Sequence, residues 1–139
     1  MIQIQPISPE QTYPLRHAVL WPDQPFDYVK IDTDADGLHY GAFEDNELMG
    51  VISLFITQTA ASRVARFRKF AVRPDRQHRG IGTRLLSYVI AEARRRGAQV
   101  LWCDARLDAA GFYRRFGMQQ TGDQFFKGPI PYAKFSLTL

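Results

Sequence analysis

The hydrophobic residues change their spacing along the chain, and each spacing predicts an element. After residue 84 they recur on one face of a 3.6-residue period, typical of an amphipathic helix; they are Leu85, Leu86, Val89, Ile90 and Ala93. Residues 64–72 alternate instead, as in a strand whose even-numbered and odd-numbered side chains lie on opposite faces. A turn that contains Gly80 and Gly82 joins the two. The pattern therefore predicts a strand–turn–helix unit at the centre of the chain.

The first third of the chain predicts a strand, a helix and a hairpin. Three isoleucines alternate with polar residues until two prolines stop this first strand. Ser8 is a suitable cap for a helix that has Pro9 at its first position and ends at Pro22. We expect its buried face to carry Leu15, Ala18, Val19 and Leu20. Strands at 38–43 and 48–56 flank an Asp-Asn turn, which is typical of a hairpin.

The last third continues the alternation of strands and helices. We expect a buried strand at 100–103, a helix at 107–116 that ends at Gly117, and two final strands at 119–126 and 132–139. This order predicts an α/β fold with a mixed sheet. A chain of 139 residues suits one hydrophobic core, so we expect a single domain over residues 1–139.

Two stretches before the hairpin allow more than one interpretation. Residues 21–28 are rich in aromatics and proline, and they form either a connection that caps the core or one wall of a substrate pocket. Asp32, Asp34 and Asp36 alternate as calcium ligands can, but the glutamate and the flanking helices of an EF-hand are missing. We therefore interpret the three aspartates as a solvated turn and predict no metal site.

Composition narrows the class of protein. Hydrophobic residues make up 45% and charged residues 23%, as in ordinary globular proteins. The chain contains one cysteine, Cys103, so it forms no internal disulfide, and a reducing compartment is indicated. No signal-peptide pattern and no long apolar run are present, so we expect a cytoplasmic protein without a membrane span.

The charge is unevenly distributed. Residues 1–62 carry two cationic and nine acidic side chains, a net charge of −7, while residues 63–139 carry sixteen and five, a net charge of +11. A basic half is compatible with nucleic-acid binding, but no helix-turn-helix, zinc-finger or RNP motif is present. Because many of the basic residues surround the glycine-bearing turn, a phosphorylated small ligand explains them better than a specific nucleic acid.

The glycine-bearing turn predicts a phosphate-binding site. The first N–H groups of a helix have no intrahelical partner, and the helix dipole adds positive potential there. Glycines in the turn allow the backbone to approach a pyrophosphate closely. The spacing fits neither the Walker loop nor the dinucleotide Gly-x-Gly-x-x-Gly motif.

Three motifs resemble those of the GCN5-related N-acetyltransferases (GNAT). The turn reads Gln77-x-x-Gly80-x-Gly82, the strand before it ends in Phe70-Ala71-Val72-Arg73-Pro74, and Ala109-x-x-Phe112-Tyr113-x-x-x-Gly117-Met118 follows downstream. The resemblance extends from about residue 38 to the C-terminus. It implies the GNAT fold, a mixed and mostly antiparallel sheet of about six to seven strands with about four helices. It also implies acetyl-CoA as co-substrate.

The resemblance assigns roles to particular positions. It implies that the cofactor is bound by Phe70, Ala71, Val72, Gln77, His78, Arg79, Gly80, Ile81, Gly82 and Thr83. The pantetheine arm would pair with the strand, and a backbone N–H near Ala71 or Val72 would donate to the oxyanion. Tyr113 stands where the family often has its general acid. The alternative is that both rings of the Phe112-Tyr113 pair belong to the core. Phe112 fits this alternative because it pairs with Phe116, whereas Tyr113 lies about 100° around the helix and need not be buried.

Other roles stay open at this stage. Some family members carry a glutamate base on the strand before the turn, where this chain has Arg66, Arg68 and Lys69. Alternatives for the general base are Asp104, Glu47, His78 or a water chain. Arg106 stands where the family commonly has an asparagine. Arg66 and Arg68 orient an acidic acceptor or are simply solvated. We interpret Cys103 as a small buried hydrophobe.

The sequence therefore predicts an N-acetyltransferase that transfers an acetyl group directly from acetyl-CoA to a primary amine of a small molecule or peptide. One alternative is a module that binds acyl-CoA without turnover, and a more distant one is a basic protein associated with nucleic acid. The acceptor and the oligomeric state stay open, although an exposed C-terminal strand suggests a homodimer.

Overall fold

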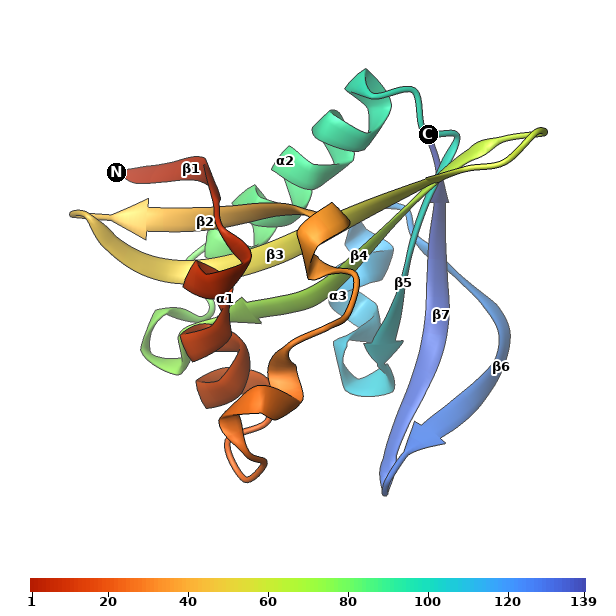
Figure 1. Cartoon of the computed structure of the whole chain (residues 1–139). Coiled ribbons are helices and arrows are strands. Elements are labelled where there is room, and N and C mark those ends of the chain that lie inside the picture. Colours follow the sequence, from red (N-terminus) through yellow and green to blue (C-terminus); the bar gives the residue numbers. More distant parts are fainter. The chain divides into compact units, whose positions relative to one another are not determined.

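The computed structural model describes residues 1–139, which form two compact units. The first unit comprises Met1–Phe55 and Phe67–Glu92, and the second comprises Ile56–Arg66 and Ala93–Leu139. Seven strands follow the order β1-β2-β3-β4-β5-β7-β6 in one hydrogen-bonded sheet (Figure 1). The predicted mixed, mostly antiparallel sheet is thus confirmed, whereas the single domain over residues 1–139 stays a prediction.

Four strands contribute to the first unit, and three of them form an antiparallel meander. Strand β1 (Ile2–Ile7) pairs with β2 (Leu38–Glu44), which pairs with β3 (Glu47–Gln58); β4 (Arg63–Val72) is next in the sheet. Asp45 and Asn46 turn the β2–β3 hairpin with φ values of 51° and 67°. Two successive residues at positive φ are what a two-residue hairpin turn requires, as the sequence predicted.

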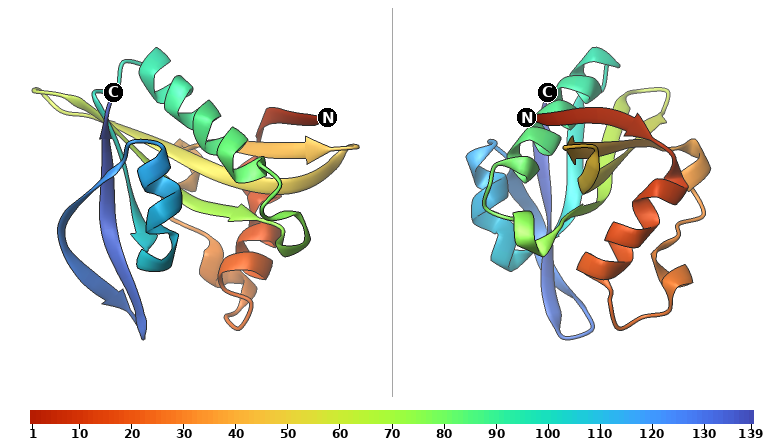
Figure 2. Two further views of the ribbon diagram at one scale, coloured as in Figure 1. Left: turned by 180° about the vertical axis from the view of Figure 1, so that it is seen from behind. Right: turned by 90° about the vertical axis from the view of Figure 1, so that its left-hand side faces the viewer.

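Helix α1 (Pro9–Leu15) and helix α2 (Ile81–Arg95) lie on opposite faces of β2 and β3 (Figures 1 and 2). On the α2 face the rings of Tyr40 and Tyr88 lie 5.1 Å apart, and a Cβ built at Gly50 would lie 2.9 Å from Leu85. On the α1 face Arg16, just after α1, reaches Ser53 of β3. The first unit is therefore a helix–sheet–helix sandwich.

The N-terminal helix begins as predicted but buries a different face. The Ser8 side chain accepts from the N–H of Gln11, and the Gln11 side chain accepts from the N–H of Ser8, a capping box worth about 1 kcal/mol. Beyond α1 the chain continues as a five-residue π-helical turn, η1 (Arg16–Leu20). The residues buried here are Thr12 and Arg16, whereas Ala18 is exposed. The predicted apolar face is therefore only partly right: Leu15, Val19 and Leu20 are half-buried, and polar residues take the fully buried positions.

Three α-helices form rather than about four. The segment after η1 makes only two 3₁₀ turns, η2 (Phe26–Val29) and η3 (Asp34–Asp36). Prolines before η2 lack the N–H that a continuing helix needs, which accounts for the difference. No helix of the structure combines the length and apolar character needed to cross a membrane.

The second unit is built on the β5 (Val100–Arg106) and β7 (Ile130–Thr138) pair. Three residues of β4, 64–66, pair in parallel with β5, and β6 (Gln119–Lys127) pairs with the other side of β7. The C-terminal strand β7 is therefore interior to the sheet, and β6 is the edge. The expectation of an exposed C-terminal strand was wrong, because the chain inserts β7 between β5 and β6.

A short helix, α3 (Ala110–Arg115), follows the 3₁₀ turn η5 (Leu107–Ala109) in the second unit. Gly117 ends it with a φ of 88°, and the N–H of Met118 donates back to the carbonyl of Tyr113. This is the glycine stop that the sequence predicted.

Candidate active site

The glycine-bearing turn forms an exposed loop between β4 and α2, and we call residues 77–83 the anion cradle. Its first residues follow the 3₁₀ turn η4 (Pro74–Arg76), and the Gln77 amide donates to the Val72 carbonyl at 3.1 Å. That bond ties the loop to the end of β4. At the other end Ile81 is 1% exposed and anchors the first turn of α2 in the core. The loop is thus held at both ends while residues 77–80 face solvent.

Two residues of the cradle have left-handed backbone conformations. His78 has a φ of 64° and Gly80 a φ of 83°. The first α2 hydrogen bond runs from the N–H of Arg84 to the carbonyl of Gly80, at 3.0 Å, so Gly80 caps the helix. The N–H groups of Ile81, Gly82 and Thr83 precede that bond and have no partner within the helix. Such a row of N–H groups at a helix start attracts anions.

The two glycines of the cradle do different things. No atom lies within 4 Å of a Cβ built at Gly80, so a larger side chain would have room there. Glycine is favoured at this position because of the positive φ of the backbone. Gly82 is the second residue of α2 and half-buried. Of these two glycines, only Gly80 has a positive φ.

The basic residues around the cradle divide into paired and unpaired ones. Arg73 donates to Asp75 and to Glu47, at 2.8 and 3.3 Å, and Arg76 pairs with Glu44 and Asp75. The hydrogen bond from Arg73 lowers the pKa of the Asp75 carboxyl. Arg79 and Arg84 are exposed and take part in none of the ion pairs of the structure. The positive charge available to a ligand is therefore smaller than the sequence count suggested.

The end of β4 leads directly into the cradle. Ala71 is buried, while Phe70 and Val72 are half-buried. Lys69 interrupts the extended strand with a φ of 54°, a left-handed conformation that is uncommon for a lysine. Residues that hold such conformations cluster at functional sites, so this irregularity lies where the sequence placed the cofactor-binding strand.

Tyr113 lies on α3 in the second unit and is 9% exposed. Its ring contacts Phe112 edge-on at 5.2 Å and lies 5.9 Å from Phe135 of β7. Burial raises the pKa of the Tyr113 phenol, with a smaller contribution from Cys103. Phe112 and Phe116 are only half-buried. Tyr113 is thus the more buried of the two rings, because the helix turns it toward β7, and this fits the alternative in which Tyr113 is a core residue.

The comparison with protein families decides the class. The sequence model of the acetyltransferase (GNAT) family matches residues 5–118. The chain belongs to this family. An N-acetyltransferase of Bacillus subtilis, YitI, described as uncharacterized, is 29% identical over 133 residues, which cover 90% of this chain and 87% of that protein.

Solved structures show the same fold at low sequence identity. An acyl-CoA N-acyltransferase from Pseudomonas aeruginosa superposes with a TM-score of 0.82 at 16% identity, covering 98% of this chain and 99% of that one. A GNAT family acetyltransferase from Elizabethkingia anophelis, solved with acetyl-CoA bound, gives a TM-score of 0.76 at 19% identity, covering 99% and 98%. The predicted GNAT fold is thus confirmed, and acetyl-CoA is the co-substrate that the family indicates.

Asp104 and Glu47, the two carboxylates considered as a catalytic base, are both held in ion pairs. Asp104 accepts from Arg66 at 3.0 Å, and Glu47 accepts from Arg73. The Arg66 guanidinium also lies 4.3 Å from the centre of the Trp102 ring. Its pairing with Asp104 weakens the hypothesis that Arg66 orients an acidic acceptor.

The free cysteine of the GNAT domain behaves as the sequence predicted. Cys103 is buried on β5, with 2% of its surface exposed. Burial raises the pKa of the Cys103 thiol, so it stays protonated and unreactive. Cys103 is therefore not part of the candidate site.

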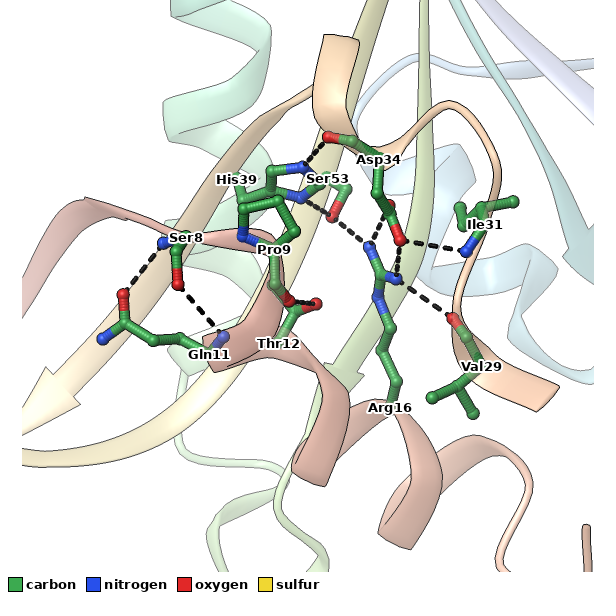
Figure 3. Close-up of polar contacts among 10 residues, drawn as sticks. All are labelled: Ser8, Pro9, Gln11, Thr12, Arg16, Val29, Ile31, Asp34, His39 and Ser53. Carbon is green, nitrogen blue, oxygen red and sulfur yellow. Dashed lines mark hydrogen bonds and ion pairs between the residues drawn. The ribbon is translucent and has the colours of Figure 1, made fainter. Parts of the chain in front are cut away.

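Sequence reasoning missed a buried polar network, which we call the arginine cluster: Arg16, Asp34, His39 and Ser53 (Figure 3). Arg16 is fully buried and pairs with both carboxylate oxygens of Asp34 at 2.9 Å. It also donates to the Val29 carbonyl and the Ser53 hydroxyl, each at 3.0 Å. The interpretation of Asp34 as part of a solvated turn was therefore wrong, while Asp32 and Asp36 are exposed as expected.

Hydrogen bonds connect all members of the cluster. The Asp34 carbonyl can only accept, so His39 Nε2, 2.8 Å away, carries a proton. Ser53 accepts from Arg16 at 3.0 Å, and its hydroxyl lies 2.7 Å from His39 Nδ1. Burial alone would raise the pKa of Asp34, but hydrogen bonds from Arg16 and from the Ile31 N–H outweigh it and lower that pKa.

An Arg and an Asp eighteen residues apart gave no signal for this pair. The available signal was the spacing of Thr12 and Arg16, which are four residues apart and therefore lie on one helix face. Because that face is the buried one, the spacing could have suggested a polar contact with the sheet.

Proposed function

We propose that this GNAT domain transfers an acetyl group from acetyl-CoA to a primary amine of a small molecule or peptide by direct attack. The observation that carries the proposal is the anion cradle, a left-handed Gly80 that caps a long helix directly after β4. In this proposal, Gln77–Thr83 bind the pyrophosphate, and Phe70–Val72 pair with the pantetheine arm as an added strand would. The ladder between β4 and β5 covers only residues 64–66 of β4, which favours the second assignment.

The proposed reaction has two proton movements. The amine nitrogen attacks the thioester carbonyl, a C–N bond forms, and the C–S bond breaks when the tetrahedral intermediate collapses. A backbone N–H of Ala71 or Val72 would stabilise the oxyanion. The nitrogen loses one proton to water or a base, and Tyr113 gives one proton to the departing thiolate. Burial keeps the Tyr113 phenol protonated at neutral pH, and the raised pKa also makes it a weaker donor to a thiolate than an exposed phenol would be.

The direct test of turnover replaces the phenol only. Tyr113→Phe removes one hydroxyl and leaves the ring contacts with Phe112 and Phe135 in place. We expect kcat to fall by about 10²–10⁴-fold with the Kd of acetyl-CoA unchanged, as for loss of a general acid. Thiol release across an amine panel measures the first quantity, and calorimetric titration measures the second. Unchanged kcat would exclude Tyr113 as the acid.

One observation favours a second candidate, an acyl-CoA-binding module without turnover. Asp104 and Glu47 are both engaged with arginines, so neither is a free carboxylate base. The same two measurements separate the candidates. Tight acetyl-CoA binding without thiol release from any amine would favour the binding module, and turnover with any amine would exclude it.

A further inference from the structure

Strand β6 of the second unit leaves one of its two edges without a neighbouring strand. It is the last strand in the order of the sheet, and its one neighbour there is β7 (Figure 1). Within β6 only Phe125 is half-buried, and every other residue is exposed. The N–H and C=O groups along such an edge can pair with a strand of another chain.

The backbone at the C-terminal end of β6 can accept a further strand. The two-residue turn at 128–129 joins β6 to β7, so Lys127 and Ile130 form the hydrogen-bonded pair that closes the hairpin. The next pair along, Phe126 and Pro131, is then a non-hydrogen-bonded one, which suits a proline because it has no N–H. The N–H and C=O of Phe126 therefore face away from β7.

The side chains at this end of β6 form a self-complementary set. Asp123 and Lys127 are both exposed and lie two residues before and two residues after Phe125. Asp123 takes part in none of the ion pairs of the structure, and the Lys127 ammonium lies 4.5 Å from the centre of the Tyr132 ring. When a second β6 lies antiparallel with its Phe125 opposite this one, Asp123 of each copy faces Lys127 of the other.

The same register uses backbone groups that β7 does not. It places Phe126 of one copy opposite Gln124 of the other, twice by symmetry. Phe126 directs its N–H and C=O away from β7, and Gln124 belongs to the bulge of residues 122–124, which have no register partner in β7. The two Phe126 rings become diagonal neighbours, within reach of each other, and Phe126 is 59% exposed in one copy alone.

We propose that β6 pairs antiparallel with β6 of a second copy of this chain, about a two-fold axis at Phe125. A two-fold interface brings the same surface together from both copies, so a strand with an acid at one end and a base at the other is complementary to itself. Parallel pairing in register would instead place Asp123 opposite Asp123, which is unfavourable. A shift of two residues would leave both charges opposite uncharged residues. The pairing is independent of the proposed function.

Charge reversal tests this register through two variants that restore each other. In a dimer of Asp123→Lys two lysines face each other, and in a dimer of Lys127→Asp two aspartates do. We expect each variant to dimerise at least about tenfold more weakly than the wild type. In an equimolar mixture of the two variants, opposite charges face each other again, and dimerisation should return. Sedimentation velocity from about 1 µM to 1 mM measures all four samples, a range that includes the weak affinity of small interfaces.

Asp23→Lys is the matched control for charge. Asp23 is exposed in the first unit, takes part in none of the ion pairs, and gives the same change in net charge as Asp123→Lys. We expect its dimerisation constant to equal that of the wild type. Equal weakening by Asp23→Lys and Asp123→Lys would show general charge repulsion and would overturn the proposal. Circular dichroism checks that each variant is folded.

A pair of apolar variants tests the same register without changing charge. Phe126→Ala should weaken dimerisation about 2–5-fold, because it removes the diagonal ring contact. Phe26→Ala is its control, since Phe26 is 46% exposed in the first unit, and it should have no effect. Equal weakening by both variants, or none by Phe126→Ala, would overturn the register.

Two results would overturn the proposal as a whole. One is a wild type that stays monomeric up to about 1 mM, the affinity limit of a very weak complex. The other is a mixture of Asp123→Lys and Lys127→Asp that stays monomeric although both variants are folded. Because none of these measurements uses acetyl-CoA or an amine, the proposed turnover stands or fails separately.

Discussion

The anion cradle and the arginine cluster lie in the same unit and use the same side chain in opposite ways. Arg16 is fully buried, and four polar contacts take up its terminal nitrogens. Arg79 and Arg84 at the cradle are exposed and form none of the ion pairs of the structure. Removing the partner of a buried, paired arginine destabilises the fold, while exposed and unpaired arginines are available to an anionic ligand.

The difference between paired and unpaired arginines changes how much positive charge a ligand can meet. The sequence alone shows sixteen cationic side chains in residues 63–139. Arg66, Arg73 and Arg76 of this set are held by carboxylates. Where a phosphate can bind therefore depends on which arginines are not paired with a carboxylate, and not on the number of arginines.

The largest expected effect is on stability and belongs to Arg16. Arg16→Ala leaves Asp34 buried without its partner, so we expect the free energy of unfolding to fall by about 3–5 kcal/mol. Arg79→Ala is the control, with an expected change within about 0.5 kcal/mol because it is an exposed surface site. Urea unfolding of both variants measures the difference. Equal small losses would show that the arginine cluster contributes little to stability.

The next effect is on cofactor affinity and belongs to Gly80. Both Asn and Asp tolerate a left-handed backbone, so Gly80→Asn and Gly80→Asp differ mainly in charge. We expect the Asp variant to bind CoA about 10–100-fold more weakly than the Asn variant, because a like charge a few ångströms away costs about 1–4 kcal/mol. Calorimetry at constant ionic strength gives both Kd values. Identical values would place the pyrophosphate elsewhere.

A smaller effect, on the pH dependence of stability, tests Asp34. Because the pKa of Asp34 is lowered in the folded state, its ionised form stabilises the protein above the ordinary carboxyl range. This contribution is lost as the pH falls through the lowered pKa. The stability advantage of the wild type over Asp34→Asn should therefore shrink below about pH 4. Unfolding curves between pH 7 and pH 3 measure it, and a constant advantage would contradict the assignment.

The smallest expected effect separates paired from unpaired arginines at the cradle. Arg79→Ala and Arg84→Ala should each weaken CoA binding about 2–5-fold and reduce its salt dependence, since exposed charges contribute about 1 kcal/mol at most. Arg73→Ala should change the Kd less, because Asp75 and Glu47 already neutralise that guanidinium. If Arg73→Ala had the larger effect, those ion pairs would not persist when CoA binds.

Sequence by itself determined the elements that depend on local chemistry. The Ser8 cap, the Asp45-Asn46 turn and the stop at Gly117 were predictable because each depends on the backbone preferences of a few neighbouring residues. The strand–turn–helix unit that forms the anion cradle was predictable for the same reason, and so was the family.

Only the tertiary structure decided which polar side chains meet. The pairs Arg16–Asp34 and Arg66–Asp104 join residues 18 and 38 positions apart, and no spacing rule relates them. It also placed β7 between β5 and β6, and turned Tyr113 rather than Phe112 into the core. The physical reason is that burial and long-range pairing are set by the packing of whole elements, whereas caps and turns are set within a few residues.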